Sequence, residues 1–150
     1  MDAPYRVEFS IPYLLPLTNV LLRMHWRKRR DVQRDLSWAV WTALEGKLPT
    51  SVIDPACVTV TRHSVASQGG PDYGGLVGGT KLLEDVLCLC SRRHPFGLGF
   101  LQDDAPKHCK LVALWCKVSH RKEQRTHVII EELTHGETAG CHDDKGASRA

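Results

Sequence analysis

Short runs of apolar and β-branched residues, bounded by turns, are typical of β-strands. Four such runs occur, at residues 5–12, 56–65, 110–118 and 126–133. The first alternates polar and apolar positions, as a half-buried strand does. The last two flank a polar turn, SHRKEQR, and we expect them to pair as a β-hairpin with a long loop.

Two other segments space their apolar residues three and four apart, which is the period of a helix with one buried face. One is residues 32–45, where Asp31 is a suitable N-cap; the other runs from about residue 76 to 90. Residues 13–30 are expected to form a loop. Gly78 and Gly79 lie early in the second helix, where their missing side chains would let another segment approach the backbone.

The order strand, helix, strand, helix, strand, strand predicts an α+β fold, in which one mixed sheet carries two main helices. A chain of 150 residues has the length of one ordinary domain. We assign residues 1–134 to this domain. The polar, Gly-rich residues 135–150 are expected to be a disordered tail.

The composition, with 42% hydrophobic and 25% charged residues, is that of a globular protein. No apolar run reaches the roughly 18 residues that span a bilayer, and the first residues do not resemble a secretory signal. We therefore expect a cytoplasmic protein with no membrane partner. The net charge is only +3, but residues 23–30 hold five Arg or Lys residues and a His. Such a cluster can neutralise phosphates.

The six cysteines are expected to be free thiols, as in most cytosolic chains. Cys57 and Cys116 lie in apolar, strand-like runs and are predicted to be core residues. A zinc site is a weaker alternative, because the spacing departs from the usual Cys-x₂₋₄-Cys pair. Its ligands would come from Cys88, Cys90, His94, His108 and Cys109.

Three acidic residues occupy turn-like positions: Asp72 in a Gly-rich turn, and Asp103 and Asp104 together in a loop. By composition alone they are solvated turn residues. Their context is more specific, because PDYGGLVGGTKLLEDVL followed by GFLQDD resembles the signature of RusA-type Holliday junction resolvases. The shared features are an Asp motif, a helix Lys, a Leu-x-Asp-Ala-Leu-like segment and an Asp-Asp pair. The resemblance covers about residues 5–133.

The resemblance implies a small α+β homodimer that binds four-way DNA junctions and cuts phosphodiester bonds with Mg²⁺, for which Mn²⁺ would substitute. By position, the implied catalytic residues are Asp72, Lys81 and Asp104, and the implied metal ligands are Asp72, Asp104 and Asp103. Asp85 matches the helix Asp of the family. The implied DNA-binding residues are Asn19, Arg23, His25, Arg27, Lys28, Arg29 and Arg30.

The family's second Asp falls on Gly74, so the resemblance predicts a metal site that is short of one carboxylate. Mg²⁺ is often held by one or two protein carboxylates and substrate phosphate. We therefore expect weak metal binding and slow cutting, with a non-catalytic DNA-binding module as the alternative. A nuclease requires Asp72 and Asp104 within bridging distance of one ion, whereas a binding module does not.

Overall fold

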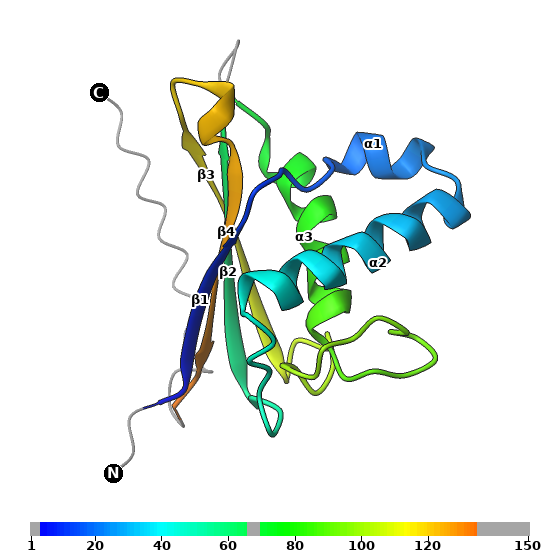
Figure 1. Ribbon diagram of the computed structural model, residues 1–150, viewed down its shortest axis with the longest axis vertical. Coiled ribbons are helices and arrows are strands. Elements are labelled where there is room, and N and C mark those ends of the chain that lie inside the picture. The colour runs from blue at the N-terminus through cyan, green and yellow to red at the C-terminus, as the bar shows by residue number, and fades with distance from the viewer. Residues whose placement is uncertain (1–3, 66–69, 135–150) are drawn as a thin grey trace.

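The computed structural model describes residues 4–65 and 70–134 and forms a two-layer α+β domain, with helices on one face of a four-stranded sheet (Figure 1). The strands are β1 (Arg6–Ile11), β2 (Ala56–Ser64), β3 (Cys109–Lys117) and β4 (Arg125–Glu132). The helices are α1 (Thr18–Arg23), α2 (Trp26–Ala43), α3 (Tyr73–Leu87) and the 3₁₀ turn η1 (Arg121–Glu123). The predicted fold class, a mixed sheet with two main helices, is confirmed. The predicted tail, 135–150, lies outside the described residues.

The sheet has the strand order β1-β4-β2-β3, so the predicted hairpin between β3 and β4 is wrong. β4 pairs antiparallel with both β1 and β2, whereas β3 pairs in parallel with the far edge of β2. The segment with η1 carries the chain past β2. Buried residues alternate along β4, because one face of the strand lies on the core and the other toward solvent. β2, α3 and β3 form a β-α-β unit, in which a helix makes the crossover between parallel strands.

The core lies between the sheet and the helices. Strand residues that face the helices are buried, and α2 and α3 pack their apolar stripes against them. The main contributors are Phe9, Ile11, Val58, Val60, Val128, Ile130, Leu36, Val40, Leu83 and Leu87. The other face of the sheet carries polar residues, such as the hydrogen-bonded group of Ser10, His127 and Glu8. Within the described residues, no helix has the length and apolar character needed to cross a membrane.

Residues 13–30 are not a loop as predicted, because they contain α1 and the first turn of α2. His25 caps α2 by accepting a hydrogen bond from the backbone N–H of Arg27, and Asp31 lies inside the helix. The apolar pattern misses this turn because its side chains are exposed and basic. Arg and Lys nevertheless have good helix propensity, and Arg29 ties the two helices by donating to the carbonyl of Leu21 at 2.7 Å.

The glycines of α3 allow the close approach that the sequence predicts. A side-chain carbon at Gly78 would lie 2.7 Å from Cα of Thr18, and one at Gly79 would overlap the carbonyl oxygen of Pro16. The Thr18 hydroxyl donates to the carbonyl of Gly74 at 2.5 Å and accepts from the N–H of Gly78 at 3.1 Å. α3 also begins three residues earlier than expected, at Tyr73. Its first half is therefore committed to packing against α1.

The segment after α3 folds back beneath the end of that helix. Leu98 and Phe100 donate backbone hydrogen bonds to the carbonyls of Val86 and Leu87, at 2.8 and 2.9 Å. Phe100 and Leu101 are fully buried and anchor the segment in the core. The residues that follow this anchor are thereby brought beside the second half of α3.

Candidate functional site

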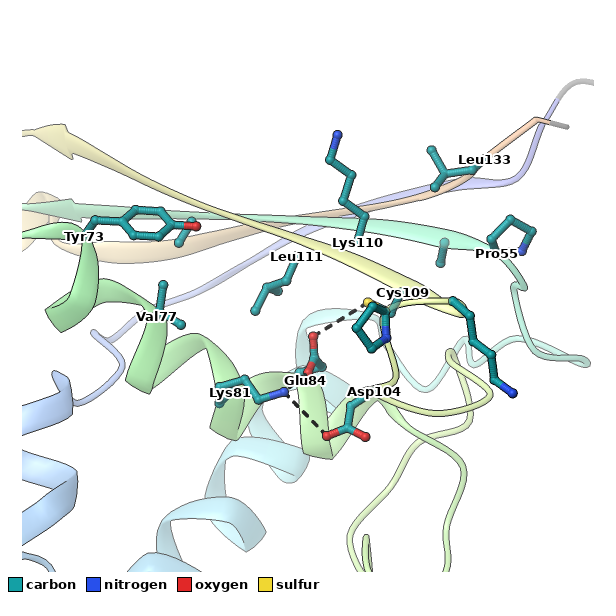
Figure 2. Close-up of a pocket in the computed structure, with 14 residues that line it drawn as sticks. Pro55, Tyr73, Val77, Lys81, Glu84, Asp104, Cys109, Lys110, Leu111 and Leu133 are labelled. Carbon is teal, nitrogen blue, oxygen red and sulfur yellow. Dashed lines mark hydrogen bonds and ion pairs between the residues drawn. The ribbon is translucent and has the colours of Figure 1, made fainter. Parts of the chain in front are cut away.

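A cleft of about 450 Å³ lies between α3 and β3 and gathers charged side chains from three parts of the chain. Figure 2 shows Lys81 on α3 directed toward Asp104, which follows the anchored segment, and Glu84 on the same helix directed toward Cys109 of β3. Lys110 comes from β3. The resemblance predicted that Lys81 and Asp104 belong to one site, and the structure brings them together.

Lys81 links the two carboxylates. Its Nζ lies 2.5 Å from Oε1 of Glu84 and 3.5 Å from Oδ2 of Asp104. Burial disfavours the charged form of Lys81, but the hydrogen bond and charge of Glu84, with the charge of Asp104, outweigh it and raise its pKa. The Glu84 carboxyl is 2% exposed, and burial raises its pKa although Lys81 opposes that shift. The buried Glu84 carboxyl therefore holds the Lys81 ammonium in place.

His94, Asp103 and Asp104 form a cluster suited to a metal ion. One ligand atom from each residue can be chosen so that all lie within 4.8 Å of one another. Oδ1 of Asp103 accepts a hydrogen bond from the backbone N–H of Asp104 at 2.7 Å. A side-chain hydrogen bond with Asp104 and this backbone bond lower the pKa of Asp103. The backbone N–H of Asp104 thus orients the Asp103 carboxylate.

Asp85 lies on the other side of His94. Its Oδ1 is 3.7 Å from Nδ1 of His94, and its Oδ2 accepts a hydrogen bond from Gln33 of α2 at 3.2 Å. Burial raises the pKa of Asp85, and the nearby His94 opposes that shift. The family-like helix Asp therefore faces the imidazole.

A basic groove of about 490 Å³ adjoins this cluster. It lies between the first turns of α2 and the segment after α3, and is lined by Trp26, Arg29, Arg30, Gln33, Arg92, Arg93 and Pro95. Nη2 of Arg93 lies 3.9 Å from Oδ1 of Asp104, which joins the groove to the carboxylates. Trp26 is 60% exposed, with the guanidinium of Arg27 5.2 Å from its ring centre. A chain of phosphates and unstacked bases can bind such a surface.

All of the predicted DNA-binding residues are exposed, and all but His25 lie on helices rather than in a loop. Arg29 and Arg30 line the basic groove, while Asn19 and Arg23 belong to α1. His25 is the N-cap of α2, and its ring already accepts a hydrogen bond from the backbone N–H of Arg27. Arg92 and Arg93 were not among the predicted residues, because they are far from the basic segment in sequence.

Asp72 does not join the carboxylate cluster. It is the N-cap of α3, and its Oδ1 accepts a hydrogen bond from the N–H of Gly75 at 2.7 Å. From Asp72 to Lys81, the α3 residue whose Nζ lies 3.5 Å from Asp104, the helix rises by about 14 Å, at roughly 1.5 Å per residue. Metal–oxygen bonds of about 2.1 Å cannot bridge that span. The structure therefore does not bring together the predicted pair Asp72 and Asp104.

The residues of the alternative zinc site do not converge within the described chain. The His94 cluster is the group of three or more His, Cys, Asp or Glu residues found there with metal-binding spacing, and it contains no cysteine. Cys88 and Cys109 are buried, and burial raises the pKa of the Cys88 thiol to about 12. Cys116 is exposed on β3, so its predicted core position is wrong.

The sequence predicts a role for His94 only as a ligand of the alternative zinc site, together with cysteines. Its neighbours, Arg93 and Pro95, are exposed, and no periodic pattern there signals that a histidine turns inward. The buried position follows from the anchored segment, in which Gly97 donates a backbone hydrogen bond to the carbonyl of His94 at 3.1 Å.

Known proteins add nothing to this geometry, because no protein-family model and no curated protein matches the chain.

Proposed function

We propose that this chain is a metal-dependent endodeoxyribonuclease of the RusA type, which cuts four-way junctions or related branched DNA. The observation that carries the proposal is the position of Asp103 and Asp104. Asp104 lies between Lys81 of the cleft, at 3.5 Å, and Arg93 of the basic groove, at 3.9 Å. A phosphate backbone bound in the groove would thus pass the carboxylates.

The residues present fit a divalent ion. Asp103 and Asp104 are adjacent carboxylates, and hard cations such as Mg²⁺ prefer oxygen ligands and keep several waters. The pair would hold Mg²⁺, with Mn²⁺ as a substitute. When bound, such an ion polarises a phosphate and makes a bound water more acidic.

The chain's own groups would bind and orient the DNA. Arg29, Arg30 and Arg92 would neutralise phosphates, and the exposed ring of Trp26 would stack on an unpaired base near the branch. Lys81, held by Glu84, would place its ammonium against a phosphate oxygen and offset charge that develops there.

A homodimer belongs to the same proposal, because symmetric cutting of a junction needs two sites related by a two-fold axis. Trp38 and Trp41 on α2 stack with ring centres 5.1 Å apart, and their side chains are 68% and 40% exposed. Aromatic residues of this kind are enriched in protein interfaces, so this pair is our candidate for the dimer contact.

The alternative is a DNA-binding module without catalysis. It is favoured by the position of Asp72, which supplies a helix cap instead of a third carboxylate. Both functions predict binding of branched DNA through the basic groove. They differ in whether Asp103 and Asp104 suffice for hydrolysis.

The test is cleavage of a synthetic four-way junction, compared with linear duplex, in Mg²⁺ and in Mn²⁺. We expect junction-selective cutting that falls at least about 100-fold in Asp104→Asn, since a group that acts on the transition state is lost. Asp72→Asn is the matched control and should cut at near wild-type rate. Tight junction binding without cutting in either metal would favour the binding module, and absence of binding would contradict both functions.

A further inference from the structure

His94 is a buried imidazole whose polar atoms lack partners. It is 8% exposed, and neither Nδ1 nor Nε2 has a hydrogen-bond partner among the described residues. A neutral imidazole carries one donor and one acceptor. Leaving such groups buried and unpaired is unfavourable, because they lose their hydrogen bonds to water. The geometry therefore points to a partner that the described chain does not supply.

The surroundings of His94 are negatively charged. Nε2 lies 3.9 Å from Oδ1 of Asp103, and Nδ1 lies 3.7 Å from Oδ1 of Asp85. Both distances are longer than a hydrogen bond. The separation of the ligand atoms of His94, Asp103 and Asp104, at most 4.8 Å, is close to what one ion requires. Bonds of about 2.1 Å place opposite ligands roughly 4.2 Å apart and neighbouring ligands roughly 3.0 Å apart, so the side chains need to close by about 1 Å.

We propose that His94, Asp103 and Asp104 bind a divalent first-row transition-metal ion in preference to Mg²⁺. This inference rests on the proposed function in that both use the two carboxylates, but it adds a nitrogen ligand and a metal preference. Imidazole is a good ligand for transition metals, whereas Mg²⁺ favours oxygen ligands and retains its waters. One nitrogen among two carboxylates therefore shifts selectivity toward the first-row ions. Mn²⁺ stands lowest in their affinity series and is the most stringent probe of this preference.

Asp85 completes the arrangement as a positioning residue. Histidine ligands commonly donate their second ring N–H to a carboxylate, which fixes the tautomer and strengthens the metal bond. Asp85 faces Nδ1 of His94 while Nε2 faces Asp103, so the ring has one nitrogen for each role. Gln33 holds the second oxygen of Asp85 at 3.2 Å.

The nearby cations leave Asp104 available to a metal. Lys81 and Arg93 approach different oxygens of Asp104, at 3.5 and 3.9 Å, and Lys81 makes its short contact with Glu84 instead. Each carboxylate oxygen has a second lone pair. Competition from these two positive charges should weaken binding without preventing it.

The test is calorimetric titration of the metal-free, full-length protein with MnCl₂ and with MgCl₂. We expect one Mn²⁺ site with a dissociation constant at least about tenfold below that for Mg²⁺. His94→Gln should weaken Mn²⁺ binding at least about tenfold and remove the preference, and Asp85→Asn should weaken it by about 10- to 100-fold. His108→Gln is the matched control, because His108 pairs with Asp54 at 3.0 Å outside the cluster.

Pulsed EPR of the Mn²⁺-loaded wild type provides a readout that needs no variant, since a bound imidazole gives ¹⁴N modulation. The modulation should persist in His108→Gln and in Asp85→Asn saturated with Mn²⁺, and should disappear in His94→Gln. Absence of modulation in the wild type, or wild-type Mn²⁺ affinity in His94→Gln, would overturn the inference. A protein that binds Mn²⁺ through His94 but cuts no DNA would contradict the proposed function alone. One that cuts in Mg²⁺ at the same rate with His94→Gln, with no Mn²⁺ preference, would contradict this inference alone.

Discussion

The two halves of α3 show how one helix divides packing from chemistry. In the first half, Gly78 and Gly79 bring the backbone against the Pro16–Thr18 segment, and Asp72 caps the end. In the second half, Lys81 and Glu84 face the cleft and meet Asp104. The motif that resembles the resolvase signature thus spans both halves, but among the described residues the second half is where its charged groups come together. Residues that are close together in the sequence motif lie several turns apart along α3, because the segment between them is helical.

The largest effect should come from removing the charge at the second half. Lys81→Met is expected to reduce junction cutting by about 100- to 1,000-fold, the usual loss for one group that stabilises transition-state charge. The measurement is single-turnover cleavage, with folding checked by circular dichroism. Lys110→Met, which removes an exposed lysine of the same cleft, should cut at near wild-type rate. Equal losses in both variants would show that the cleft acts only by its overall charge.

In the first half of α3, one added methyl group should lower the free energy of unfolding and leave the charged groups of the cleft unchanged. Gly78→Ala places a carbon 2.7 Å from Cα of Thr18, and we expect a loss of about 1–3 kcal/mol in the free energy of unfolding. This loss should prevail over the helix-propensity gain of about 1 kcal/mol. Urea denaturation measures it. Gly74→Ala is the control, because nothing lies within 4 Å of the added carbon, and it should be neutral or stabilising.

The role of Asp72 as a cap makes a smaller prediction. Asp72→Ala removes the acceptor for the N–H of Gly75 and should destabilise the protein by about 1 kcal/mol. Asp72→Ser, which retains an acceptor, should recover most of that loss. Mn²⁺ affinity, measured by titration, should be unchanged in both variants. A drop in metal affinity for Asp72→Ser at full stability would place Asp72 in the metal site and break the division between the halves.

The smallest effect is expected at Gly74, where the resemblance calls for an Asp. Gly74→Asp should not increase metal affinity or cutting, because this position opens to solvent in the first turn of α3, far from Asp104. The negative charge near the helix N-terminus should add only about 0.3–1 kcal/mol of stability. Calorimetry with MnCl₂ and the junction assay check both points. A gain in cutting would mean that the first half of α3 rearranges when DNA binds.

Local patterns predicted the elements better than their pairing. All four strands lie within two residues of the predicted positions, because alternation and β-branched residues are local properties. The partners of β4 are not local: Val128 pairs with Phe9 on one side and with Val60 on the other. The polar turn before β4 resembles a hairpin connection, and nothing in its sequence shows that the chain passes over β2.

The candidate site was predictable to the extent that its residues follow a linear motif. Lys81 contacts Asp104, the residue after Asp103, as the resemblance predicts. Asp72 lies apart from them, because residues 73–80 are helical and separate it from Lys81 along the helix axis. His94 reaches the site only because Phe100 and Leu101 anchor the segment beneath α3. The position of His94 therefore depends on tertiary packing, and no spacing of residues along the sequence predicts it.

The position of β4 inside the sheet, between β1 and β2, affects the order in which the protein folds. β1 has β4 as its strand neighbour, and Arg6 and Glu131, which pair across them, are 125 positions apart in the chain. During synthesis the hydrogen-bonding edge of β1 stays unpaired until nearly all of the domain has emerged. Such distant pairing slows folding, and uncovered strand edges invite association between chains. We therefore expect refolding yield to fall as protein concentration rises, with closure of β4 between β1 and β2 as the late step.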